Sequence, residues 1–169
     1  MKGLARLLSA VALWALSGLA MAQAVLPVPP LSGRVIDQTG TLSAAQQQAM
    51  SDKLAAVEAK RGSQVVVLMV PSTQPEDIAA YGQRVADQWK IGRLAVGDGI
   101  LVVVAKDDRR VRIEVAKALE GAVPDLAAKQ IISEVITPAF RKNDFAGGLN
   151  AAIDRLDARI GNEGLPEPS

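Results

Sequence analysis

The chain has 169 residues, no cysteine, no histidine and a formal net charge of +1. Its length fits one domain whose core is large enough to fold without disulfide bonds or a structural metal. The absence of histidine and cysteine excludes Ser-His-Asp and Cys-His nucleophilic sites and the usual zinc sites. A bound metal would therefore need oxygen ligands, which favours calcium or magnesium.

Residues 1–22 have the three parts of a secretory signal peptide. Two basic residues precede an apolar stretch, and Ala20-Met21-Ala22 forms a cleavage site before Gln23. We expect cleavage after Ala22 and a periplasmic or secreted protein; the alternative is an uncleaved membrane anchor. Cleavage removes two of the nineteen basic residues and none of the eighteen acidic ones, which leaves 17 − 18 = −1. A near-neutral chain lacks the charge of a nucleic-acid binder, so no nucleic-acid partner is expected.

The rest of the chain alternates between apolar runs and amphipathic stretches, after a proline-rich segment at 23–32 that predicts an extended tether. Ser43 is a suitable helix N-cap, and Gly62 ends the helix that follows it. In chain order, the predicted elements are a strand at 35–37, a helix at 44–61, a strand at 64–70, a helix at 76–89 with Pro75 in its first turn, strands at 99–105 and 110–116, a helix from 124 that Pro138 ends or bends, and a helix from 143 or 144 to 160.

Together these elements predict an α/β fold, an α/β/α sandwich with a small mixed sheet. The runs at 64–70 and 99–105 are continuously apolar, which is typical of strands buried on both faces. The helix between them makes a βαβ unit with parallel strands, and the turn at 106–109 adds the next strand as an antiparallel hairpin. The predicted domain covers 33–160, followed by a flexible tail at 161–169. No glycine-rich phosphate loop follows a strand, and no organic cofactor is expected.

Three acidic residues are predicted to meet at one end of this sheet. Asp98 begins its strand, and the hairpin returns the chain to the same end, where Glu120 and Asp125 follow. Carboxylates beside a glycine turn and a helix N-terminus suit a hard cation, so we predict a calcium site, with magnesium less favoured. Asp37 is a fourth candidate ligand, although the sequence does not decide which end it reaches. Asp98 and Glu120 are also the candidate catalytic residues.

Each of these residues also has a simpler explanation. Asp98 can stabilise a turn, Asp125 can cap a helix, and Glu120 can pair with Lys117 or Arg112. Asp107 and Asp108 are expected to be solvated turn residues. The cations Arg109, Arg110 and Arg112 are explained by a solvated strand face, with phosphate binding as the alternative. Trp89 is expected to anchor the core.

Several segments in order resemble the TPM domain family, whose members occur in plant thylakoids, bacterial envelopes and some animal membrane proteins. The segments that carry the resemblance are Val35-Ile36-Asp37, Trp89-Lys90-Ile91-Gly92, Asp98-Gly99-Ile100-Leu101, Arg110-Val111-Arg112-Ile113-Glu114, Leu119-Glu120-Gly121 with Pro124-Asp125, and Pro138 with Phe140-Arg141 and Asp144-Phe145. The resemblance implies an α/β/α sandwich. Where many members have Gly-Tyr-Gly, this chain has Ala116-Lys117-Ala118, which places a cation beside the acidic loop.

The resemblance implies two classes of function, because some members are described as acid phosphatases and others as calcium binders or accessory proteins of membrane complexes. The lack of a visible nucleophile favours a divalent-cation binding or accessory module of the cell envelope, with an envelope or membrane protein as partner. The alternative is a metal-dependent phosphatase. Many members continue into a transmembrane helix; this chain ends at Ser169, so no stable membrane insertion is expected after cleavage.

Export predicts a defined mature end. N-terminal sequencing of protein recovered outside the cytoplasm should begin at Gln23, because the small residues at 20 and 22 fit signal peptidase. Recovery of the intact Met1 end in the membrane fraction would instead identify an uncleaved anchor.

Overall fold

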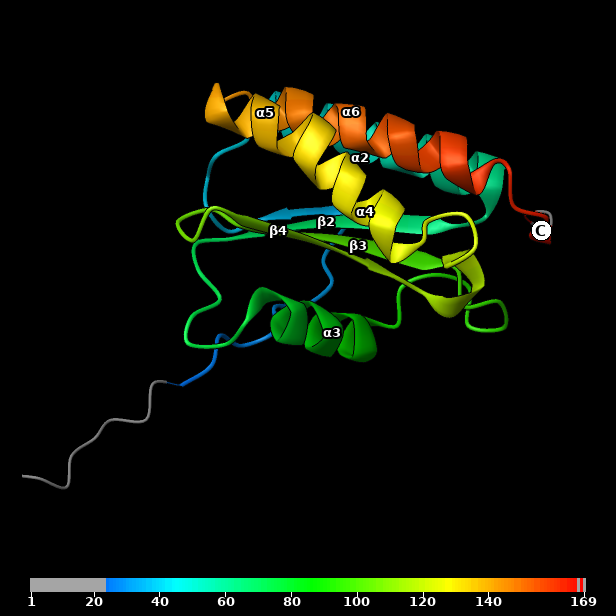
Figure 1. The fold of residues 1–169 in the computed structure, drawn as a ribbon, viewed down its shortest axis with the longest axis horizontal. Helices are drawn as coiled ribbons and strands as arrows, with labels where there is room; N and C mark the ends of the chain where they lie inside the picture. Colours follow the sequence, from blue (N-terminus) through cyan, green and yellow to red (C-terminus); the bar gives the residue numbers. More distant parts are fainter. Residues whose placement is uncertain (1–23, 167, 169) are drawn as a thin grey trace, which may run out of the picture.

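The computed structural model of the chain describes residues 24–166 and 168. Within these residues a single mixed sheet of four strands has the order β1-β2-β3-β4 (Figure 1). The first three strands are parallel, and β4 pairs antiparallel with β3. The strands are β1 (Val35–Asp37), β2 (Gln64–Val70), β3 (Gly99–Ala105) and β4 (Arg110–Val115). The predicted βαβ unit and hairpin are confirmed.

Helices cover both faces of the sheet, as an α/β/α sandwich requires. Figure 1 shows α3 below the sheet and α2, α4, α5 and α6 above it. The helices are α2 (Ala44–Arg61), α3 (Ile78–Trp89), α4 (Asp125–Ile131), α5 (Thr137–Arg141) and α6 (Phe145–Ile160). In the described part of the chain no helix is long and apolar enough to span a bilayer.

The two central strands divide their side chains between two cores. Val65, Val67 and Met69 of β2 join the larger core under the helical layer, whereas Val66 and Leu68 join the smaller core against α3. Every residue of β3 is buried. Burying one such side chain contributes about 1.5–3 kcal/mol, so both helical layers are needed to keep these strands out of water.

Helix α2 begins and ends at the residues that its sequence predicts. Ser43 accepts a hydrogen bond from the Gln46 backbone N–H, and the Gln46 side chain accepts one from the Ser43 N–H, which completes a capping box. Gly62 follows with φ of 77°, a left-handed conformation that glycine adopts without strain. Helix α3 starts later than predicted, with Asp77 as its N-cap rather than Pro75 in its first turn.

Pro138 bends the third helical segment rather than ending it. Between α4 and α5 the chain forms a π-helical turn, η3 (Ile132–Ile136), in which the Thr137 N–H bonds to the Ile132 carbonyl five residues back. Because proline has no N–H to donate, the wider turn absorbs the change in register before α5 continues. Asp144 then caps α6 by accepting from the Gly147 N–H at 2.9 Å.

The proline-rich segment lies against α3. Three α3 side chains donate hydrogen bonds to its backbone carbonyls: Arg84 to Leu26 at 2.8 Å, Tyr81 to Pro27 at 3.4 Å and Trp89 to Pro29 at 2.8 Å. Leu26 and Val28 also pack against the smaller core. Residues 24–32, which we call the strap, form no helix or strand, and these contacts hold them to the domain rather than leaving them as a free tether.

The tail beyond α6 also contacts the domain. Leu165 packs against the larger core, and the Arg93 guanidinium donates a hydrogen bond to the Pro166 carbonyl at 2.9 Å. Residues 161–166, predicted to be flexible, therefore lie beside the end of the sheet where β3 begins.

Trp89→Phe tests the strap, because it keeps an aromatic ring against the smaller core and removes the indole N–H together with its five-membered ring. Loss of the bond to the buried Pro29 carbonyl should lower the free energy of unfolding by about 1 kcal/mol and the Tm by about 2–4 °C. Thermal melting measures the shift, and Gln88→Ala, at the exposed neighbouring position, is the control. Equal melting temperatures for the parent and Trp89→Phe would show that this bond does not contribute.

Candidate functional site

Asp98 lies at the start of β3, completely buried and surrounded by donors. The Arg93 side chain reaches its Oδ2 with Nη2 at 2.6 Å and Nε at 2.8 Å. The Arg93 backbone N–H donates to Oδ1 at 2.8 Å, and the Ser63 hydroxyl lies 3.3 Å from Oδ2. The carboxylate is thus neutralised and hydrogen-bonded by the protein itself.

Arg93 is the residue that the sequence reasoning missed. Its side chain, one quarter exposed, binds Asp98 and the Pro166 carbonyl and lies beside Gly62, where an added Cβ would come within 2.6 Å of the Arg93 Cζ. The signal for it lies in the loop between α3 and β3. Gly92 and Gly97 both have positive φ there, so the loop folds back on itself and brings a residue five positions before Asp98 onto its carboxylate.

Asp125 lies near the same end of the sheet, but on the surface. Its carboxylate contacts Lys129 one helical turn later at 2.7 Å and lies 3.9 Å from an Arg112 nitrogen. These two cations, Lys129 above all, lower the pKa of Asp125. Asp125 is the first residue of α4, so its negative charge also complements the helix dipole. The capping role considered for Asp125 is wrong, because Pro124 is the N-cap of α4 and no side chain makes a capping bond there; Asp125 acts through its charge in the first turn.

Asp37 lies at the opposite end of the sheet. It is the last residue of β1, which runs parallel to β3, whereas Asp98 precedes the first residue of β3. Its carboxylate accepts hydrogen bonds from the backbone N–H groups of Thr39 and Leu42, both at 2.8 Å. Burial acts to raise the pKa of Asp37, but these hydrogen bonds outweigh it and the pKa is lowered. Asp37 shapes the loop into α2 and does not approach Asp98.

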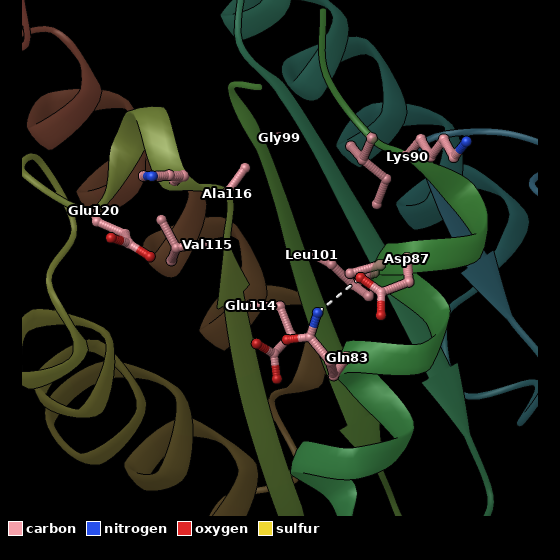
Figure 2. Close-up of a pocket in the computed structure, with 12 residues that line it drawn as sticks. Gln83, Asp87, Lys90, Gly99, Leu101, Glu114, Val115, Ala116 and Glu120 are labelled. Carbon is pink, nitrogen blue, oxygen red and sulfur yellow. Dashed lines mark hydrogen bonds between the residues drawn. The ribbon is translucent and has the colours of Figure 1, made fainter. Parts of the chain in front are cut away.

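Glu120 lines a groove of about 350 Å³ between α3 and the C-terminal end of β4, which we call the α3–β4 groove. Figure 2 shows Gln83, Asp87 and Glu114 facing one another, with Glu120 apart from them past Val115 and Ala116. The charged residues of its lining are Asp87, Lys90, Glu114, Lys117 and Glu120. The groove is thus lined by both carboxylates and ammonium groups.

The acids of the groove differ in their partners. Glu114 binds Arg112, with Nε to Oε1 at 2.6 Å, and Asp87 accepts from the Gln83 amide at 2.8 Å. Glu120 is exposed and enters no ion pair with the residues that the structure describes. Arg112, considered as its partner, is committed to Glu114. Among the described residues, Glu120 is therefore the groove carboxylate that no side chain engages.

Three of the four predicted ligands lie at one end of the sheet, as predicted, but their carboxylates do not converge on one site. The hairpin does return Glu120 and Asp125 to the end of the sheet where Asp98 lies. However, Asp98 is buried in an ion pair with Arg93, and Asp125 is paired with Lys129. Asp37 lies at the other end of the sheet. Among residues 24–166, no three acidic side chains lie close enough to hold a metal ion. The arrangement does not fit a calcium site built from these four residues, and calcium binding stays a prediction.

The acids of the hairpin turn separate as well. Asp108 accepts hydrogen bonds from the Ser72 hydroxyl at 2.7 Å and the Thr73 N–H at 2.9 Å, so it fastens the turn to the loop after β2. Asp107 is exposed, as a solvated turn residue should be. The expectation of a solvated turn side chain thus fits Asp107 and is wrong for Asp108, whose carboxylate is held by Ser72 and Thr73.

Asp98→Asn tests the structural role of the buried pair. Removing one partner of a buried ion pair costs about 3–5 kcal/mol, and we expect roughly 3 kcal/mol here because Arg93 keeps some access to water. Chemical denaturation measures the change, with Asp125→Asn as a matched control that removes a surface charge. An unfolding free energy equal to that of the control would contradict this role.

Comparisons with known proteins give one family. The model of the TPM domain matches residues 35–159. The solution structure of the N-terminal domain of a P. gingivalis protein is 31% identical, with a TM-score of 0.72, and the match covers 82% of this chain and 93% of that one. No curated protein matches the chain.

Two further solution structures share the fold at lower identity. The N-terminal domain of the cg2496 protein from Corynebacterium glutamicum is 17% identical with a TM-score of 0.62, over 85% of this chain and 93% of that one. The BA42 protein from Bizionia argentinensis is 20% identical with a TM-score of 0.64, over 75% and 92%. The family match and the close structural relative agree with the sheet, the helical layers and the hairpin described above, and the chain belongs to the TPM domain family.

Proposed function

We propose that this protein is an exported accessory module of the cell envelope that acts by binding, and that the α3–β4 groove is its binding site. The observation that carries the proposal is the exposed Glu120 carboxylate at a groove whose other acids already have partners. Glu120 is thus the carboxylate left to bind a divalent cation in the groove. Calcium is preferred to magnesium because it tolerates irregular oxygen ligands.

The proposed cation site is a weak one. Asp87 and Glu114 lie at some distance from Glu120 in the groove, and Lys90 and Lys117 add two positive charges to its lining. Few available carboxylates and nearby ammonium groups reduce the attraction for a cation. We place the affinity in the range of extracellular calcium modules, with a Kd on the order of 10⁻⁴–10⁻³ M.

The geometry favours binding over phosphatase activity. An enzyme with Asp98 as acid or base needs that carboxylate to reach a substrate, and it is completely buried against Arg93. Glu120 is accessible, but no serine, threonine or lysine in the described groove is paired with a base that would activate it as a nucleophile. The phosphatase alternative therefore has no observation of its own in its favour.

Calcium titration of the chain from Gln23 onward tests the proposal. At a tenfold excess over Kd, binding to the folded state alone stabilises it by about 1.4 kcal/mol, which raises the Tm by about 3–5 °C. Glu120→Gln should remove this shift, whereas Asp125→Asn, which deletes an equal charge outside the groove, should retain it. Thermal melting with calcium and with magnesium gives the comparison.

The outcomes separate the alternatives. A shift that Asp125→Asn abolishes and Glu120→Gln leaves intact would move the site to the start of α4. The absence of a shift in the parent would overturn the cation proposal. Metal-stimulated hydrolysis of p-nitrophenyl phosphate that is lost in Glu120→Gln would replace the binding role with the enzymatic one.

A further inference from the structure

A second and larger cavity, of about 690 Å³, lies at the other end of the β3–β4 hairpin, on the helical side of the sheet. It is formed by the end of β3, the hairpin turn, the start of β4, α5 and the first residue of α6. Its charged lining consists of Lys106, Asp107, Arg109, Arg110 and Arg141. Four cations and one carboxylate give 4 − 1 = +3, in a chain whose whole formal charge is +1. We call this cavity the basic pocket.

The three arginines of the basic pocket are available to a ligand. No salt bridge or side-chain hydrogen bond within residues 24–166 engages Arg109, Arg110 or Arg141, and all three are exposed. In contrast, Arg112, two residues after Arg110, is committed to Glu114. Of the two acids in the turn, Asp108 is committed to Ser72 and Thr73, and Asp107 lines the pocket. A cluster of like charges without partners is unfavourable in isolation and favours an anionic ligand.

An aromatic pair forms the apolar part of the same pocket. The rings of Phe140 and Phe145 have centroids 4.7 Å apart and are tilted by 46°, and both are partly buried against the larger core. The Lys106 ammonium lies 5.3 Å from the centre of the Phe145 ring, a cation–π distance. The aromatic pair thus provides a surface for an apolar group next to the cations.

The backbone around the pocket is held in place. The Lys106 and Asp107 N–H groups donate to the Val70 and Pro71 carbonyls at 3.0 and 2.8 Å, which fixes the hairpin turn to the end of β2. On the other side, the Asn143 and Asp144 N–H groups donate to the Phe140 and Ala139 carbonyls, both at 3.0 Å, which fixes the loop between α5 and α6. Both walls of the pocket are therefore tied to the fold, which lowers the entropic cost of binding.

We propose that the basic pocket docks an acidic segment of a partner protein, with its carboxylates at Arg109, Arg110 and Arg141 and an apolar side chain against Phe140 and Phe145. Guanidinium groups bind carboxylates through paired hydrogen bonds, and several of them suit a segment with more than one acid. The pocket is much larger than a single inorganic anion and is partly aromatic, which favours a ligand with an apolar portion. A lipid surface fits less well, because the two rings line a concavity and are partly buried.

The test uses the ¹⁵N-labelled chain from Gln23 onward and a synthetic peptide with two glutamates on each side of a leucine. Titration followed by amide NMR should shift signals from 104–111 and 137–145, with an affinity that falls as salt rises. Arg141→Gln and Arg110→Gln should each weaken binding about tenfold, the effect of one lost charge-assisted contact. Arg155→Gln, at an exposed arginine of α6 outside the pocket, should leave it unchanged.

Two control peptides separate the charge from the apolar contact. Replacing the glutamates with glutamine should abolish binding, and replacing the leucine with serine should weaken it.

The proposal is overturned if the glutamine peptide binds equally, if Arg155→Gln weakens binding as much as Arg141→Gln, or if the glutamate peptide does not bind. Binding of phosphatidylglycerol vesicles without the peptide would assign a lipid surface instead, and inorganic phosphate that displaces the peptide with equal affinity would assign a small-anion site. These results are independent of the α3–β4 groove, which lies on the other face and at the other end of the hairpin.

Discussion

Burial of β2 and β3 on both faces is the constraint on which the rest of this structure depends. Two adjacent parallel strands made of valine, leucine, isoleucine and methionine need an apolar cover on each side. The chain supplies α3 as the crossover between them on one face and the α2, α4, α5 and α6 layer on the other. Polar chemistry is consequently confined to the ends of the sheet and to its β4 edge, where the charged residues of β4 alternate with apolar ones.

The two ends of the β3–β4 hairpin differ in their electrostatics for local reasons. At the end where β3 begins, arginine and aspartate are paired inside the protein, and the groove beside them carries acids and lysines together. At the turn, the acids are either committed to the backbone or outnumbered, and the arginines are left unpaired with the described residues. One antiparallel strand pair therefore separates a mixed-charge groove from a basic pocket, with a buried apolar strand between them.

The sequence predicts the fold of this chain better than its functional surface, because the periodicity of apolar residues reports burial directly. The runs of β2 and β3, the capping box of α2 and the hairpin are all local patterns, and the structure has each of them. Which end of the sheet Asp37 reaches depends on the direction of β1, a long-range pairing that a three-residue strand does not encode.

The side-chain partners are the harder part, since they depend on how loops close. Arg93 reaches Asp98 because two glycines with positive φ turn the loop back on itself. The order of residues in the sequence does not show that this arginine and this aspartate are partners. The basic pocket could not be predicted either, because its arginines come from the hairpin and from α5, about 30 residues apart in the sequence. The strap is a similar case: its composition predicts a segment without helix, but its attachment depends on three side chains of α3.

That attachment has a mechanical consequence. A pulling force applied at the N-terminal side of the domain first reaches the carbonyls of Leu26, Pro27 and Pro29, which are bonded to three side chains along one helix. Their rupture frees the segment up to Arg34, where the Arg34 carbonyl accepts from the Val67 N–H and the chain joins the sheet. The contacts of the strap with α3 therefore carry such a force before the hydrogen bonds of β1 do.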